Sequence, residues 1–254
     1  MKADPAAQLA LLDLQALDSR ADQLRHQLRT LPELAEIGAL QAQRSAHENQ
    51  RRDAQIAVDD LTVEQSKLDA DVEQVKARRT RDQQRMDQGL ITNPKDLERM
   101  QGELVSLQRR ISSLEDDELE VMARLEDAQG DLDRFAAQVA EADERLTALG
   151  KSRDARTLEV EEELTRVAAD RGPVAESVPE PLLALYERLR VSKGGVAVGA
   201  LRARECGGCR LSLDPSELAQ IRAAAPDEVL RHEECQRILV RTPESGISPA
   251  LDKQ

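Results

Sequence analysis

The residues of this chain best suited to chemistry are three cysteines and one histidine near its C-terminal end. Cys206 and Cys209 lie in the run CGGC, and His232 and Cys235 lie in HEEC, with 22 residues between the two runs. Each C-x2-C or H-x2-C turn presents two ligand atoms from one tight loop, and two such loops complete a tetrahedron around zinc. The spacing therefore predicts one Zn²⁺ ion. Four protein ligands leave no position for an activated water, so we expect the ion to be structural.

Alternatives to this ligand set remain open in the sequence. Glu233 or Glu234 could supply an oxygen ligand in place of His232, although imidazole suits zinc better and His232 holds the right spacing. The cysteines could also be buried thiols beside an incidental histidine. Paired loops are more specific for metal than one C-x2-C, and clustered cysteines in a reducing compartment favour metal over disulfide. The sequence therefore favours a zinc site over buried thiols.

The segments around these residues predict a zinc ribbon over 196–242. Gly207 and Gly208 suit a turn that needs unusual backbone angles. Within the gap, Asp214 to Glu217 reads as a helix cap, a first-turn Pro and a capping partner. The flanking pieces VAVGAL, RLSL, EVLR and RILV have the alternating or β-branched character of short strands.

The rest of the chain reads as long helices. Charged residues make up 33% and aromatic residues 1%, so the apolar residues cannot form one thick core. They recur instead at alternating gaps of three and four, as in a coiled-coil seam. The seam is continuous from Leu97 to Leu149, with one polar interruption at Glu118.

A break at 89–94 predicts that the chain folds back into an antiparallel hairpin. Facing positions then match: Val72 opposes Ile111 and Met86 opposes Leu97. Pro32 falls opposite Gly150, which predicts a bend there. A coiled coil of two chains without folding back would not require these coincidences. We expect a mainly α fold with a hairpin at 1–171, a linker and short helix at 172–195, the ribbon at 196–242 and a flexible tail at 243–254.

Several runs of the sequence resemble those of a known protein family. The run NPKDLERM after the break, then SLQRRISSLED, PEPLLALYERLR and the CGGC loop, is similar to the bacterial zinc-ribbon/coiled-coil proteins. These are described as nucleic-acid-binding proteins with a four-cysteine zinc ribbon. The resemblance implies cysteine at all four ligand positions, and His232 departs from it. Some relatives are associated with flagellar or secretion machinery, an alternative sigma factor and RNA.

Two functions from different classes follow. The first is a non-enzymatic adaptor that binds protein partners, in a transcription- or RNA-linked role. The second is direct, salt-sensitive nucleic-acid binding through arginines, despite a net charge of −13 and few aromatic rings for base stacking. The candidate contacts are Arg202, Arg204, Arg210, Arg231, Arg237 and Arg241 in the ribbon, and Arg78, Arg79, Arg81 and Arg85 near the hairpin tip.

Other classes find no support in the sequence. No phosphate-binding loop, nucleophile motif or open metal site is present, so we expect no enzyme activity and no small-molecule substrate. No segment is apolar enough for a bilayer, and the N-terminus lacks the apolar core of a secretory signal, so we expect a cytoplasmic protein. The chain is expected to be a monomer or a homodimer.

Overall fold

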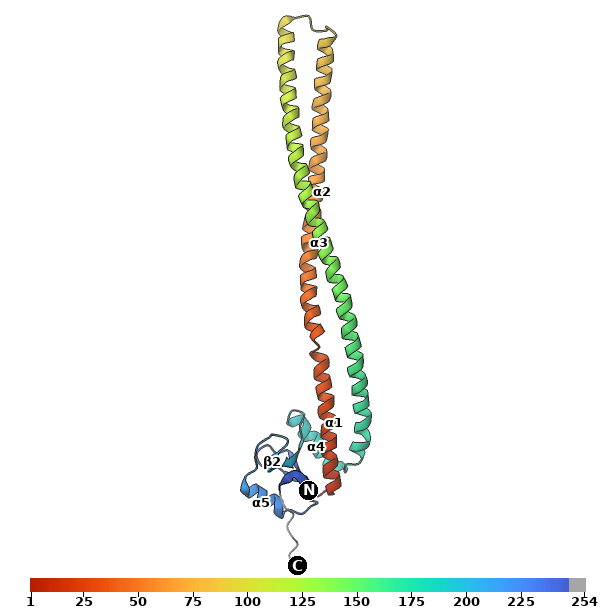
Figure 1. Ribbon diagram of the computed structural model, residues 1–254, viewed down its shortest axis with the longest axis vertical. Coiled ribbons are helices and arrows are strands. Elements are labelled where there is room, and N and C mark those ends of the chain that lie inside the picture. The colour runs from red at the N-terminus through yellow and green to blue at the C-terminus, as the bar shows by residue number, and fades with distance from the viewer. Residues whose placement is uncertain (247–254) are drawn as a thin grey trace, which may run out of the picture. The chain divides into compact units, whose positions relative to one another are not determined.

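The computed structural model describes residues 1–246 and contains five α-helices, a four-stranded sheet and one 3₁₀ turn (Figure 1). The helices are α1 (Pro5–Arg29), α2 (Pro32–Asp87), α3 (Pro94–Glu176), α4 (Glu180–Ser192) and α5 (Pro215–Ala223). The strands are β1 (Val198–Arg202), β2 (Glu205–Cys206), β3 (Leu230–Arg231) and β4 (Ile238–Arg241), and the turn is η1 (Pro243–Ser245). The predicted mainly α fold, with a helical hairpin and a small C-terminal ribbon, is confirmed.

The chain divides into two compact units. One unit comprises residues 35–151, and the other joins 1–34 with 152–254. The border falls beside Pro32 and Gly150, where the sequence predicts a bend. The first helix and the end of α3 group with the ribbon in the second of these units, and the domain limits predicted from the sequence stay a prediction.

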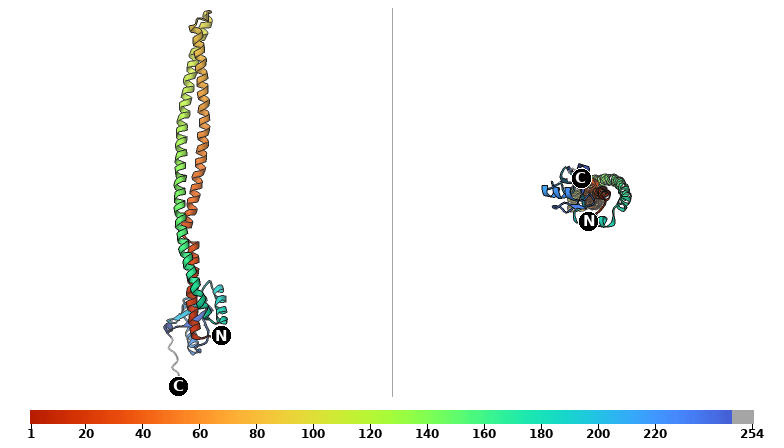
Figure 2. Two further views of the ribbon diagram at one scale, coloured as in Figure 1. Left: turned by 90° about the vertical axis from the view of Figure 1, so that its right-hand side faces the viewer. Right: turned by 90° about the horizontal axis from the view of Figure 1, so that it is seen from below.

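The unit 35–151 consists of two antiparallel helical arms (Figure 2). A loop at 88–93 joins α2 to α3, which matches the predicted tip. Asn93 caps α3, since its side chain accepts a hydrogen bond from Lys95 N at 3.0 Å. The predicted seam is buried at the following positions: Leu61, Val72, Ile111, Leu114 and Val121.

Ion pairs across the seam support the antiparallel arrangement. Arg44 pairs with Asp143, and Lys76 with Glu115 at 2.9 Å. Arg78 pairs with Glu103 close to the tip. These pairs are solvent-exposed, so each contributes little to stability, but they are consistent with the predicted register.

One helix limit differs from the sequence expectation, and the position where a bend is expected lies within a helix. Gly150 lies inside α3, where a single glycine costs only about 1 kcal/mol relative to alanine and does not end a long packed helix. Pro173 also lies inside α3, which continues to Glu176 instead of ending near Arg171. Apolar residues that follow this proline, Val174 and Ala175, pack against the core of the same unit, and this packing offsets the lost backbone hydrogen bond.

In the other unit, α1 packs against both the end of α3 and the ribbon. One cluster joins α1 to the end of α3 through Ala21, Leu24, Val160 and Val167. A second, larger cluster joins α1 to α4 and the sheet. Its fully buried members include Leu11, Leu14, Leu182, Tyr186 and Ile238.

The sheet has strand order β2-β1-β4-β3. β1 runs parallel to β4, with Val198 opposite Ile238, and the outer pairs are antiparallel. The expected strand RLSL is absent from this sheet apart from one bridge between Glu205 and Ser212. The first part of the predicted flexible tail forms η1, where Ser245 is buried, and residues 247–254 of that tail lie outside the described residues.

The N-terminus contributes to the ribbon, which the sequence did not predict. Ala3 N donates to Asp227 O at 2.7 Å, and Val229 N donates to Met1 O at 3.0 Å. Gln15 is buried and joins α1 to the segment that enters β1, because its Nε2 donates to Gly195 O at 2.8 Å and its Oε1 accepts from Ala197 N at 2.7 Å. The N-terminal segment and α1 therefore stabilise the ribbon through direct hydrogen bonds.

A buried charge network also holds this unit together. Asp18 on α1 is 3% exposed and accepts from Arg171 Nε at 2.8 Å and from Tyr186 Oη at 2.7 Å. Burial by itself would raise the pKa of Asp18, but the hydrogen bonds from Arg171 and Tyr186 outweigh it and lower that pKa. α1, α3 and α4 thus meet at one carboxylate.

Candidate metal centre

The structure brings the four predicted ligands into one cluster. The sulfur atoms of Cys206, Cys209 and Cys235 and a ring nitrogen of His232 all lie within 4.8 Å of one another. Cys206 and His232 are fully buried. Glu233 and Glu234 are exposed and do not belong to the cluster, so the alternative in which they replace the histidine finds no support in the geometry.

The separations fit a tetrahedral zinc site. Cys206 Sγ lies 4.0 Å from Cys235 Sγ, and His232 Nδ1 lies 3.3 Å from Cys209 Sγ and 3.1 Å from Cys235 Sγ. Zinc bonds of about 2.3 Å to sulfur and about 2.0–2.1 Å to nitrogen imply edges of roughly 3.8 Å between sulfurs and roughly 3.5 Å between sulfur and nitrogen. The donor set thus suits one structural ion, with His232 facing it through Nδ1.

The thiols differ in their readiness to ionise. Burial raises the pKa of Cys206 to about 11, against hydrogen bonds from the backbone N–H groups of Gly208 and Cys209. Burial acts in the same direction on Cys235, but hydrogen bonds from the backbone of Arg237 and from His232 outweigh it and lower the pKa of Cys235 to about 6. The thiol of Cys206 would therefore have to release its proton to serve as a zinc ligand at neutral pH.

The glycines of the first loop are needed for close packing. Neither Gly207 nor Gly208 has a positive φ, which corrects the expectation of unusual backbone angles. The left-handed conformation falls instead on Arg210 and Gln236, at φ of 63° and 59°, which follow the second ligand of each loop. A Cβ on Gly207 would lie 2.9 Å from Ala200 O, because the loop stacks directly on β1.

The 22-residue insert supplies α5, with one difference from the sequence expectation. Asp214 caps it, since Oδ1 accepts from Ser216 N at 3.1 Å. Glu217, however, does not complete a capping box. It is 5% exposed, and its Oε1 accepts from Glu233 N at 2.8 Å in the second metal loop. The insert is thereby joined to the ligand-bearing turn.

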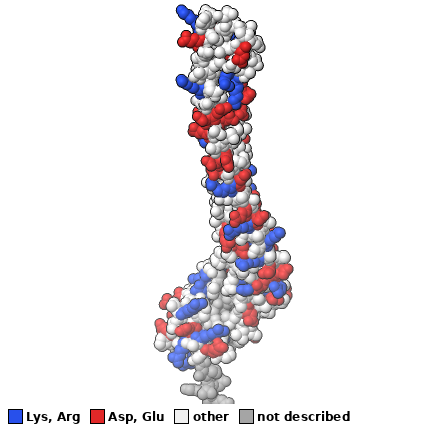
Figure 3. Space-filling model, turned by 45° about the horizontal axis from the view of Figure 1, so that its top comes forward, with Lys and Arg blue, Asp and Glu red and all other residues white. Residues whose placement is uncertain are grey.

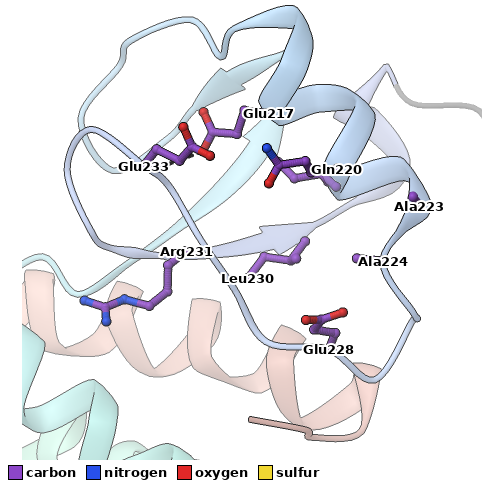
Figure 4. Close-up of a pocket in the computed structure, with 9 residues that line it drawn as sticks. Glu217, Gln220, Ala223, Ala224, Glu228, Leu230, Arg231 and Glu233 are labelled. Atoms are coloured by element: carbon purple, nitrogen blue, oxygen red, sulfur yellow. Dashed lines mark hydrogen bonds between the residues drawn. The ribbon is translucent and has the colours of Figure 1, made fainter.

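A pocket of ≈ 340 Å³ lies between α5 and β3 (Figure 4). Glu217 and Glu233 lie close together at one end of it, and Gln220 and Leu230 line its middle. No role for this pocket was expected from the sequence.

Three of the predicted contact arginines of the ribbon bind its own backbone. Arg237 donates to Val196 O at 2.8 Å and to Lys193 O at 3.1 Å. Arg241 donates to carbonyls that follow α5, among them Ala224 O at 2.9 Å. Arg231 donates to Gln236 O.

The remaining predicted arginines lie at the surface. Arg202 pairs with Glu244 at 3.1 Å, and Arg78 pairs with Glu103. The side chains of the others are exposed and make no hydrogen bond or ion pair within residues 1–246, namely those of Arg79, Arg81, Arg85, Arg204 and Arg210. A contact with a partner stays a prediction for each.

Three residues that support the site were not predicted from the sequence. Gln15 lies on a distant helix, Arg237 reads as a surface cation, and Glu217 reads as a helix-capping residue. A carboxylate in the insert between two metal loops is the one signal that could have pointed to Glu217.

No helix in the described part of the chain combines the length and the apolar character needed to cross a bilayer.

Comparison with known proteins agrees with this architecture. An uncharacterized protein of Mycobacterium tuberculosis is 37% identical over 243 residues, covering 95% of this chain and 98% of its own length. An uncharacterized protein of Mycobacterium leprae is 30% identical, covering 93% and 97%. A solved structure from Mycobacterium smegmatis is 33% identical with a TM-score of 0.83, covering 95% of this chain and 100% of that one.

More distant similarity extends to the structure of CT398 from Chlamydia trachomatis. It has a TM-score of 0.69 at 17% identity, covering 93% of this chain and 98% of that one, and so shows a shared fold. The model of a C4-type zinc ribbon domain matches residues 206–239, and that of a CT398-like coiled coil hairpin domain matches residues 14–194. The chain therefore belongs to the CT398-like coiled-coil hairpin family and carries a C4-type zinc ribbon in which His232 occupies one of the four ligand positions.

Proposed function

We propose that this protein is a non-enzymatic adaptor whose hairpin binds a protein partner while the zinc ribbon forms a second, rigid binding head. The observation that carries the proposal is a pair of exposed apolar side chains on α2. Ile56 is 59% exposed and Val63 is 53% exposed. Seven residues are two turns of helix, so both side chains lie on one face.

This face is distinct from the seam. The seam of α2 is filled by Leu61 and Val72, which are buried, so the exposed pair is not required for the hairpin itself. An amphipathic face with apolar residues at helical spacing suits a partner helix or groove. Leu119 on α3, 63% exposed, adds a further apolar side chain to the same unit.

The charge distribution favours a protein partner over nucleic acid. On the face that Figure 3 shows, acidic and basic side chains alternate along the helices, and no continuous basic field forms. Phosphate-led binding needs concentrated Lys and Arg. Arg231, Arg237 and Arg241 are also engaged with the ribbon backbone.

Capture from extracts of the source organism tests the proposal. Full-length protein is immobilised, and retained material is compared at low and high salt, with and without nuclease. A protein retained at high salt after nuclease treatment, and lost with Ile56→Gln/Val63→Gln, supports the adaptor. The matched control is Leu158→Gln, which removes an apolar side chain that is 59% exposed on the other unit.

The opposite outcome would favour nucleic acid. In that case retention disappears with nuclease or salt, and Arg79→Glu/Arg81→Glu abolishes binding. Arg109→Glu/Arg110→Glu is then the control, because it reverses two exposed charges farther from the tip.

A further inference from the structure

As a zinc ligand, His232 needs a hydrogen-bond acceptor for its second ring nitrogen, which a cysteine ligand would not need. Its Nδ1 faces the thiols, so zinc coordination places the proton of the neutral ring on Nε2. That nitrogen is buried and has no hydrogen-bond partner among the described residues. A buried N–H without an acceptor is costly, so the site needs an acceptor on the far side of the ring.

Glu217 is placed to be that acceptor. Its Oε2 lies 3.7 Å from His232 Nε2, within ion-pair distance and a short movement away from a hydrogen bond. The carboxylate is only 5% exposed, so it too needs partners. Its other oxygen is held by Glu233 N at 2.8 Å, which orients the group toward the loop that carries the ligand.

We propose that Glu217 is a positioning residue for the metal site: it accepts the Nε2–H of His232 and thereby fixes Nδ1 as the zinc ligand. Metal-binding histidines commonly donate their second ring N–H to a carboxylate, which sets the tautomer and raises the basicity of the ligand. The helix α5 in the insert thus serves to present this carboxylate. The inference rests on the zinc site and is independent of the adaptor function.

Zinc affinity provides the first test. Competition against a chromophoric chelator is measured for the full chain and for Glu217→Gln, which keeps an oxygen for Glu233 N but removes the charge. We expect Glu217→Gln to weaken zinc binding by about 10- to 100-fold. Glu233→Gln is the matched control, because it removes an exposed charge beside the same pocket without facing the ring, and it should bind zinc as the parent chain does.

The same substitution in a His232→Cys variant distinguishes a positioning role of Glu217 from a general effect on folding. In His232→Cys the ring is absent, so adding Glu217→Gln should leave zinc affinity unchanged. An equal loss in both backgrounds would show that Glu217 acts only through α5 or the Glu233 backbone, and would overturn the proposal. So would a loss in Glu233→Gln as large as that in Glu217→Gln.

The ring itself gives a readout that needs no variant. In a ¹H–¹⁵N NMR spectrum of the zinc-loaded protein, His232 should show a metal-bound Nδ1 and a protonated, slowly exchanging Nε2. A ring bound through Nε2, or an Nε2 proton that exchanges as fast as that of an exposed histidine, would refute the assignment even if Glu217→Gln does not fold.

Discussion

Replacement of Tyr186 by phenylalanine tests whether the charge network around Asp18 stabilises the fold. Tyr186→Phe removes one hydroxyl and leaves the ring in the core, where Tyr186 is fully buried. Asp18 then loses the 2.7 Å hydrogen bond from Tyr186 but keeps Arg171 at 2.8 Å. A hydrogen bond to a charged group contributes about 1.5–3 kcal/mol, so we expect a loss of that size in the free energy of unfolding.

Amide hydrogen exchange by mass spectrometry is the appropriate assay, because α4 reports on this unit while far-UV circular dichroism is dominated by the hairpin helices. Amides of α4 should exchange about 10- to 150-fold faster in Tyr186→Phe, which is the same free energy expressed as a ratio. Ser66→Ala is the matched control, since it deletes a hydroxyl whose hydrogen bond to Thr62 O lies on an exposed helix surface. It should leave α4 unchanged.

The stabilisation by this hydrogen bond should decrease both at acid pH, through Asp18, and at alkaline pH, through Tyr186. The folded pKa of Asp18 is lowered, so its stabilisation is complete above the unfolded value of about 3.9 and is lost as pH falls through the folded pKa. The pKa of Tyr186 is raised, first by burial and then by Asp18, so its contribution is complete below the unfolded value of about 10 and declines above it. The difference between parent and Tyr186→Phe should therefore be constant from about pH 4 to 10 and shrink outside it.

Equal exchange in both proteins at pH 7 would refute the stabilising role of the network. A difference that does not shrink at acid pH, even where Asp18 is protonated in both folded proteins, would show that the hydroxyl acts through packing and that the charge of Asp18 is irrelevant to it.

The remaining predictions concern the ribbon and its support. Gly199→Ala should lower thermal stability, because a Cβ there would lie 2.3 Å from Gly208 N, whereas Gly130→Ala, with nothing within 4 Å, should raise helix stability by about 0.5–1 kcal/mol. Gln15→Ala removes the partner of the half-buried Gly195 carbonyl and of the buried N–H groups of Ala197 and Val198, and should cost about 1–3 kcal/mol for each buried group, measured by chemical denaturation; an unchanged midpoint would contradict the tie between α1 and the ribbon. Removal of zinc with a chelator should unprotect residues 196–242 in hydrogen exchange while helical circular dichroism is retained, and protection of that segment in metal-free protein would contradict a structural ion.

Local patterns explain why much of the fold was predictable. The seam from Leu97 onward and the capped break at Asn93 are properties of consecutive residues, and an antiparallel hairpin follows because facing seams must both be buried. The ligand set was equally local, since each pair sits in one turn and zinc chemistry restricts which residues can complete a tetrahedron.

Other local patterns misled because tertiary packing outweighed them. Pro173 reads as a helix end, yet the residues after it are held helical by the core. Gly207 reads as a residue chosen for backbone freedom, yet it is needed because β1 passes within contact distance. Arg237 and Arg241 read as surface cations, yet they bind carbonyls of the ribbon.

The sequence by itself determined the long helical segments, the turn between the arms and the candidate metal ligands, because each depends on spacing along the chain, and the structure then selected His232 over the neighbouring glutamates. Only the tertiary structure decided that α1 supports the ribbon, that Asp18 joins three helices, and that Glu217 faces His232. Those contacts join residues from distant parts of the chain or, for Glu217, a residue inside the insert to a ligand in the second metal loop. Their partners are selected by burial and hydrogen bonding in three dimensions, which no periodicity along the sequence encodes.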